Sequence, residues 1–159
     1  MISRVKVIVL VGLPGSGKST WAAGRRRATV LSSDAIRLLL AGDETDQSIH
    51  ARVFATMRFL LRQRLAVGRG DTIIDATNLA RKWRRDWVKI ARAAGAELEA
   101  VFFDTPLEVC LARNKGRSRV VPEAALRSMA SKLRAPELAE GFTRVKTIRA
   151  SGRARRREG

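Results

Sequence analysis

The chain has 159 residues, 45% of them hydrophobic, which is enough for one domain with a buried core. Its 32 Lys and Arg residues against 15 Asp and Glu residues give a net charge of +17, which favours polyanionic partners, although an arginine-rich solvated surface gives the same sum. One cysteine (Cys110) excludes a disulfide framework, and no apolar run has the length of a membrane span. Residues 1–4 run directly into a predicted strand, which leaves no room for a signal peptide, so we expect a cytoplasmic protein without membrane contact.

The first predicted element is a strand over 5–11, followed directly by Gly-Leu-Pro-Gly-Ser-Gly-Lys-Ser at 12–19. A strand, a glycine loop and a helix start are the context in which G-x-x-x-x-G-K-[ST] binds a nucleoside triphosphate. Glycines let backbone N–H groups approach phosphate oxygens, Lys18 would reach the β- and γ-phosphates, and Ser19 would bind Mg²⁺. The positive end of the following helix adds to this attraction. We expect nucleotide contacts from Gly12, Pro14, Gly15, Ser16, Gly17, Lys18, Ser19 and Thr20.

Four more apolar runs predict strands at 29–32, 71–75, 98–103 and 144–149, with helical patterns between them. This alternation indicates an α/β fold with a mainly parallel five-stranded sheet, which the glycine loop makes a P-loop NTPase. Polar residues follow the middle three strands, where a parallel sheet has its ligand crevice. They are Ser33-Asp34, Ala76-Thr77-Asn78 and Asp104-Thr105.

The longest predicted helix runs from 45 to 67, and its apolar stripe at three- and four-residue steps is interpreted as core: Ile49, Val53, Met57, Leu60, Leu61 and Leu65. Further helices are expected at 82–94, ended by Gly95, and at 106–114 and 122–133, each opened by a proline. We expect one domain over 1–149 and a basic, disordered tail over 150–159.

Asp34 and Arg37 stand one helical turn apart behind the second strand. In phosphoryl transfer to a hydroxyl, the carboxylate would accept the proton and the guanidinium would hold a substrate phosphate. A helix N-cap with an i, i+3 ion pair has the same pattern, and the residues alone leave both interpretations open.

Asp75 closes the third strand, where an acid can reach Mg²⁺ directly or through water. A structural hydrogen bond to the glycine loop is the alternative. Thr77 and Asn78 could cap the next helix or shape an acceptor pocket.

Residues 113–119 hold four cations in seven positions between two proline-opened helices. If this segment lies over the phosphates of the bound nucleotide, it is an arginine-rich lid whose cations neutralise charge in the transition state. The alternative is a solvated basic turn. Trp83 lies among basic residues at 81–85, a pattern that suits stacking on a nucleic-acid strand, although most tryptophans are simply buried. His50 is the only histidine, which does not suffice for a zinc site.

Four strings occur in order: G-x-P-G-S-G-K-S-T-W-A, S-x-D-x-x-R, D-A-T-N-L and R-x-x-x-R-x-x-x-V-P. Over about residues 5–145 the chain resembles the polynucleotide-kinase-like P-loop kinases, to which the 5′-kinase domain of bacteriophage polynucleotide kinase belongs. The resemblance implies ATP and Mg²⁺ at Lys18 and Ser19, and Asp34 as general base on a 5′-hydroxyl. It also implies Arg37 on the acceptor's first phosphate, with Arg113 and Arg117 as lid arginines around the donor phosphates.

In one respect the chain departs from the phage pattern, which has its aspartate one position later, at the place of Ala76. Asp75 matches bacterial relatives with the string Asp-Ala-Thr-Asn. The expected function is transfer of the γ-phosphoryl group of ATP to a 5′-OH end of DNA or RNA, with Lys18, Asp34, Arg37 and Arg117 as catalytic residues.

The first alternative is a P-loop kinase for a metabolite, nucleoside or antibiotic, because fold does not fix the substrate. A second is a nucleotide-binding regulator with weak turnover, against which intact Asp34, Arg37 and Arg117 argue. The sequence leaves the choice between DNA and RNA, the nucleotide donor and the oligomeric state open.

Overall fold

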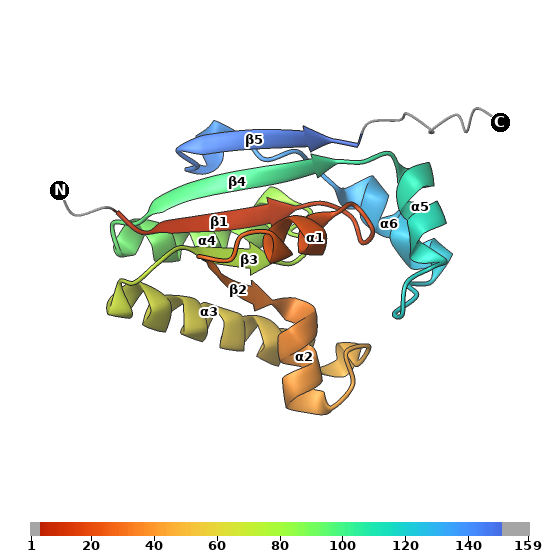
Figure 1. Cartoon of the computed structure of the whole chain (residues 1–159), viewed down its shortest axis with the longest axis horizontal. Helices are drawn as coiled ribbons and strands as arrows, with labels where there is room; N and C mark the ends of the chain where they lie inside the picture. The colour runs from red at the N-terminus through yellow and green to blue at the C-terminus, as the bar shows by residue number, and fades with distance from the viewer. Residues whose placement is uncertain (1–3, 151–159) are drawn as a thin grey trace.

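The computed structural model describes residues 4–150 of the chain. Five strands form one sheet in the order β2-β3-β1-β4-β5, and every neighbouring pair is parallel (Figure 1). The predicted α/β class and five-stranded parallel sheet are confirmed, with each strand within one residue of its expected bounds. The strands are β1 Lys6–Val11, β2 Thr29–Ser32, β3 Thr72–Asp75, β4 Glu97–Asp104 and β5 Arg144–Arg149.

The helices are α1 Lys18–Ala23, α2 Ser33–Ala41, α3 His50–Val67, α4 Arg81–Ala93, α5 Leu107–Asn114 and α6 Glu123–Lys132, with 3₁₀ turns η1 Gln47–Ile49 and η2 Leu138–Glu140. The strand arrowheads in Figure 1 point to the end of the molecule where α2, α5 and α6 lie. The loops at the carboxyl ends of the strands therefore gather at this end. All but the first residue of the expected tail over 150–159 lies outside the described residues.

The long helix begins at His50 instead of Thr45, and aspartate side chains explain the difference. Asp43 Oδ1 accepts hydrogen bonds from the Thr45 N–H at 2.9 Å and the Thr45 hydroxyl at 2.7 Å, and Asp46 Oδ1 accepts from the Ser48 N–H at 2.9 Å. Such local bonds offer the backbone an alternative to the helix. Two tight turns therefore precede α3.

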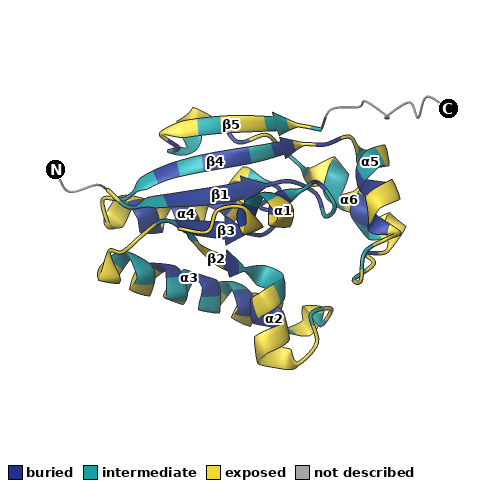
Figure 2. Ribbon diagram, viewed as in Figure 1, coloured by how far each residue is buried: buried dark blue, intermediate teal, exposed yellow. Residues whose placement is uncertain are grey.

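The core lies on both faces of the central strand β1, which is almost entirely buried (Figure 2). Alternate side chains along β1 face opposite layers, as expected for a parallel sheet that is covered on both sides. One set packs with α3 and α4 and the other with α1. The stripe on α3 is confirmed as core, because Val53, Met57 and Leu61 are fully buried in it.

Buried polar side chains hold the loop after β3. Asn78 has φ of 47°, its Nδ2 donates to the Leu10 carbonyl at 2.7 Å, and its Oδ1 accepts from Trp87 Nε1 at 2.8 Å. Arg84, 1% exposed, donates to the Asn78 carbonyl at 2.8 Å and to both carboxylate oxygens of Glu140 at 2.8 and 2.9 Å. Asn78 thus orders the loop and does not cap α4, which follows Ala80 without a side-chain cap.

No helix within residues 4–150 combines the length and apolarity that a membrane crossing requires.

Candidate active site

A cleft of about 1240 Å³ opens at the carboxyl ends of the strands. Its walls are the glycine loop, the start of α2, the turn leading into α3, and the segment between α5 and α6. The strand ends predicted to converge contribute Asp34, Asp75, Thr77 and Thr105 to the lining, whereas the carboxylate of Asp104 lies 3.7 Å from Arg149 in an exposed pair. The cleft is cationic, because five lysine and arginine side chains line it against two carboxylates.

The glycine loop is shaped by left-handed backbone at Gly15 (φ 80°) and Gly17 (φ 104°), a conformation that other residues rarely adopt. Lys18 begins α1, and its Nζ donates to the carbonyl oxygens of Gly12 at 2.9 Å and Leu13 at 2.8 Å. Burial lowers the pKa of Lys18 to about 8, although Asp75 acts in the opposite direction. The ammonium group is therefore held over the loop.

Three buried side-chain atoms within residues 4–150 have no hydrogen-bond partner: Ser16 Oγ, Arg37 Nε and Arg117 Nη1. All three belong to residues that line the cleft. Buried polar atoms are nearly always paired, so these unpaired atoms indicate a polar ligand. Two of them are guanidinium donors, which suit phosphate oxygens. The loop therefore fits a nucleoside triphosphate.

Close packing around Gly12 keeps the loop near the sheet. A Cβ at this position would lie 2.7 Å from Ser16 Oγ and 3.0 Å from Phe103 Cβ, so both side chains would have to shift. Glycine thus lets the loop start this close to β4 without displacing either side chain.

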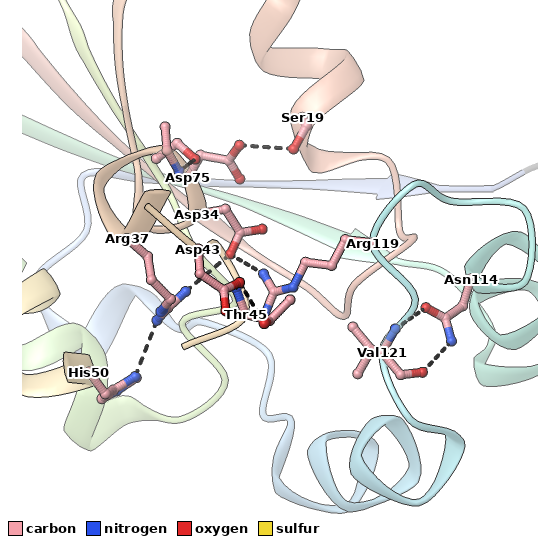
Figure 3. A network of polar contacts seen from close by, with 12 residues as sticks. Ser19, Asp34, Arg37, Asp43, Thr45, His50, Asp75, Asn114, Arg119 and Val121 are labelled. Atoms are coloured by element: carbon pink, nitrogen blue, oxygen red, sulfur yellow. Dashed lines mark hydrogen bonds and ion pairs between the residues drawn. The ribbon is translucent and has the colours of Figure 1, made fainter. Parts of the chain in front are cut away.

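The predicted magnesium residues lie next to each other, with Ser19 Oγ donating to Asp75 Oδ2 at 3.0 Å (Figure 3). Burial raises the pKa of Asp75, while Lys18 opposes this shift. The structural hydrogen bond considered as an alternative is therefore present. The same two oxygens are hard ligands, and Mg²⁺ commonly takes one or two protein oxygens together with phosphates and water. Ser19 and Asp75 would hold the ion.

Asp34 and Arg37 stand on the first turns of α2, facing the cleft. The N-cap of α2 is Ser32, whose Oγ accepts from the Ala35 N–H at 3.2 Å, so the interpretation of Asp34 as an N-cap is wrong. The i, i+3 ion pair is present, with Arg37 Nη1 at 3.2 Å from Asp34 Oδ1. The Arg37 side chain is only 4% exposed, whereas that of Asp34 is 41% exposed. A buried cation thus holds an accessible carboxylate at the mouth of the cleft.

Arg119 is a site residue that the sequence analysis missed. Its Nη1 contacts Asp34 Oδ1 from the side opposite Arg37, so two guanidinium groups point toward one carboxylate oxygen (Figure 3). Arg119 is one of the four cations in residues 113–119, and nothing in their spacing distinguishes the one that reaches α2.

The segment between α5 and α6 lies over the cleft, as the lid interpretation requires. Its ends are joined by Asn114, which donates to the Val121 carbonyl at 2.6 Å and accepts from the Val121 N–H at 2.9 Å. Arg113 Nη1 donates to the Gly15 carbonyl at 3.2 Å, and Arg117 lines the cleft wall. Arg113 therefore contacts the glycine loop, and Arg117 lies close enough to Lys18 to help lower its pKa.

Trp83 lies outside the cleft lining, 46% exposed on α4, with Lys82 Nζ 4.6 Å from the ring centroid. Its role in stacking stays a prediction. Cys110 is buried behind the glycine loop, as expected for a small core residue, and burial raises the pKa of its thiol.

A parallel sheet in the order β2-β3-β1-β4-β5, with a glycine loop and Lys18 after β1, defines a P-loop NTPase fold. Residues 7–136 match the family model of an AAA domain, AAA_33, and the chain belongs to this P-loop kinase family.

Two curated relatives are similar to this chain. L-seryl-tRNA(Sec) kinase of Methanococcus maripaludis is 27% identical over 82% of this chain and 53% of its own length. The bifunctional polynucleotide phosphatase/kinase of Schizosaccharomyces pombe is 24% identical over 90% of this chain and 33% of its own length. The chain thus spans about half or less of the curated relatives it matches.

Solved structures share the fold. One, from the Pnkp1/Rnl/Hen1 RNA repair complex, has a TM-score of 0.71 at 22% identity, covering 84% of this chain and 45% of that chain. The Mycobacterium tuberculosis APS kinase CysC, solved with AMPPNP and APS, has a TM-score of 0.62 at 24% identity, covering 91% of this chain and 88% of that chain. The same fold therefore occurs in a protein of an RNA repair complex and in a kinase solved with the small molecule APS.

Proposed function

We propose that this chain is an ATP-dependent kinase that transfers the γ-phosphoryl group to the 5′-hydroxyl end of DNA or RNA. The observation that carries the proposal is that Asp34, the glycine loop, Arg37 and Arg117 line one cleft. A carboxylate and a triphosphate site facing the same space leave room for an alcohol between them.

In the reaction, the acceptor hydroxyl would give its proton to Asp34 while its oxygen attacks the γ-phosphorus of ATP. The bond from this phosphorus to the β,γ-bridging oxygen breaks, and ADP leaves. Lys18 and Arg117 would stabilise the charge on the transferring group, and Arg37 would hold the phosphate that follows the acceptor's first nucleoside. Mg²⁺ held by Ser19 and Asp75 would neutralise part of the phosphate charge.

The nucleic-acid acceptor is supported by charge and by the relatives. The net charge of +17 would add a sequence-independent attraction to a polyanionic strand. The Schizosaccharomyces pombe relative is named a bifunctional polynucleotide phosphatase/kinase, and the Methanococcus maripaludis relative an L-seryl-tRNA(Sec) kinase. Both names describe phosphorylation of a nucleic acid or of a group attached to one.

A small anionic alcohol is the alternative acceptor. Arg37 is almost fully buried with its Nε unpaired, which equally suits a compact phosphate or carboxylate on a small molecule. The fold shared with APS kinase is compatible with this acceptor class.

The test is an acceptor panel with labelled ATP and Mg²⁺: a 5′-OH DNA oligonucleotide, its RNA counterpart, the same oligonucleotides with 5′-phosphate, nucleosides and small sugar acids. We expect label only on the 5′-OH oligonucleotides. Transfer to a small alcohol with none to either oligonucleotide would replace the proposal with the alternative.

Salt gives an independent readout. Raising the salt concentration from 50 to 200 mM should weaken oligonucleotide binding by about tenfold or more, because several phosphates are contacted, while the KM for ATP changes less. A flat response of oligonucleotide binding would contradict a nucleic-acid track on the basic surface.

A further inference from the structure

Two aromatic side chains line the same cleft on the side away from the glycine loop. His50 and Phe54 occupy successive turns at the start of α3, and their ring centroids lie 4.7 Å apart with 39° between the planes. Phe54 also packs against buried Trp87, with centroids 6.4 Å apart, so its ring is anchored in the core. Nothing in the phosphoryl-transfer mechanism uses either ring.

Arg37 connects this pair to the site of chemistry (Figure 3). Its Nη1 lies 3.2 Å from Asp34 Oδ1, and its Nη2 lies 3.5 Å from His50 Nδ1. One guanidinium group therefore separates the carboxylate from the histidine ring. In a nucleotide the sugar likewise separates the 5′-oxygen from the base.

We propose that His50 and Phe54 form a binding subsite for the nucleobase of the acceptor's terminal nucleotide, beside the Arg37 phosphate contact. This inference rests on the proposed function and specifies its acceptor: a nucleotide with an intact base. Aromatic side chains bind bases by stacking on their faces, which tolerates any sequence. Thr45 and Gln47, from the turns before α3, also line the cleft and would supply polar groups to a bound base.

The electrostatics of the pair are compatible with stacking. Burial and then the nearby Arg37 lower the pKa of His50, which favours the neutral imidazole, and its Nδ1 can then accept a hydrogen bond from the Arg37 guanidinium. A neutral ring also avoids a second positive charge beside Arg37. The histidine can thus position Arg37 and offer its face to a base.

The test measures binding without turnover. A 5′-OH oligonucleotide with 2-aminopurine as its terminal base is added to the full chain without ATP, and base fluorescence is followed. We expect quenching by the wild-type protein. His50→Ala and Phe54→Leu should lose most of it and bind roughly tenfold more weakly, the size of one lost stack. His50→Phe should keep the quenching, because it retains an aromatic face.

Two controls separate stacking from general damage. Phe59→Leu alters a phenylalanine of the same helix that is 58% exposed and outside the cleft lining, and it should behave as wild type. An oligonucleotide with an abasic 5′-terminal residue should bind wild type roughly tenfold more weakly, and the His50 and Phe54 changes should then add nothing. Thermal unfolding of each variant verifies that Phe54→Leu is folded, and Phe54→Met replaces it if not.

The outcomes distinguish this inference from the proposed function. Unchanged quenching in His50→Ala and Phe54→Leu, or an equal penalty on the abasic oligonucleotide, overturns the subsite. Quenching without label transfer after ATP is added overturns the 5′-kinase function and leaves the subsite standing. Transfer without quenching does the reverse, and no oligonucleotide binding overturns both.

Discussion

The donor and acceptor sides of the cleft are built in different ways. The glycine loop is fixed by its own backbone and by neighbouring strands: the Gly12 N–H donates to the Thr77 carbonyl at 3.0 Å, and Thr105 Oγ1 donates to the Ser16 carbonyl at 3.0 Å. The acceptor side depends on long side chains from separate segments, with Arg37 and Arg119 meeting Asp34. Hydrogen bonds to the main chain of the loop set the donor site in advance, whereas ion pairs between side chains can rearrange around an incoming acceptor.

This difference has a consequence for substrate choice. A loop held by main-chain hydrogen bonds presents the same amides whatever acceptor is used, so one triphosphate site can serve many kinases. The acceptor is selected by a few side chains that differ from one chain to the next. Variants on the two sides should therefore have separable effects on ATP binding and on transfer.

The largest expected effect is on the acceptor side. Asp34→Ala should lower kcat about 10²- to 10⁴-fold, because the proton of the attacking hydroxyl loses its acceptor, while the Kd for ATP is unchanged. Glu44→Ala, a half-buried carboxylate beyond α2 that does not line the cleft, is the matched control and should behave as wild type. Rates from quenched-flow transfer and affinities from equilibrium titration are compared. A parallel loss of ATP affinity would place Asp34 on the donor side.

Arg117 should show the next largest effect. Arg117→Ala is expected to lower kcat about 10²- to 10³-fold, since a donor aimed at developing phosphoryl charge is lost, with at most a threefold change in the Kd for ATP. Lys115→Ala removes an exposed cation from the same segment and should leave kcat within about twofold of wild type. Equal changes in kcat and ATP affinity would reduce Arg117 to a binding contact.

The sequence was sufficient for the glycine loop and for all five strands. The loop string stands between an apolar strand and a helix, and the strands are apolar runs, so both depend on local chain order. Arg119, by contrast, reaches Asp34 across 85 positions, and three nearby cations have the same local pattern. From the sequence, His50 was only a lone histidine that does not suffice for a zinc site. Its contact with Arg37 was not predicted, because nothing local links the two residues. Asn78 was expected to cap a helix or shape a pocket. Its left-handed backbone and its hydrogen bond to Trp87 depend on how α4 packs, which no local pattern reveals.

The donor side should also respond to pH through Lys18. Its pKa of about 8 in the free protein means that the ammonium form is lost as pH rises through 8. ATP affinity should therefore decline above pH 8, by at most about tenfold per pH unit, and be steady between pH 6.5 and 7.5. Isothermal titration with a non-hydrolysable ATP analogue across pH 6.5–9 measures the slope.

The control for this slope is Lys18→Ala, which should bind the analogue weakly with no decline above pH 8. A wild-type profile that stays flat up to pH 9 would mean that the Lys18 ammonium does not contact the triphosphate.

The smallest effect is expected for Arg119. Its partner Asp34 is 41% exposed, and ion pairs of this kind are worth roughly 0–1 kcal/mol. Arg119→Ala should therefore change kcat/KM for the acceptor by no more than about fivefold, and lower the free energy of unfolding by less than about 1 kcal/mol. Steady-state kinetics and urea denaturation provide the two values. A loss as large as that of Arg117→Ala would give Arg119 a place in the transition state.

The back of the glycine loop touches the helix from which the lid extends. A Cβ at Gly15 would lie 3.1 Å from the Cys110 carbonyl oxygen, and Arg113 of the same helix donates to the Gly15 carbonyl at 3.2 Å. The lid is the direct continuation of α5, so the position of the loop and the position of the lid arginines share this contact. A side chain at residue 15 would push against the Cys110 backbone in a strained backbone conformation, and would therefore separate the loop from the helix that carries the lid.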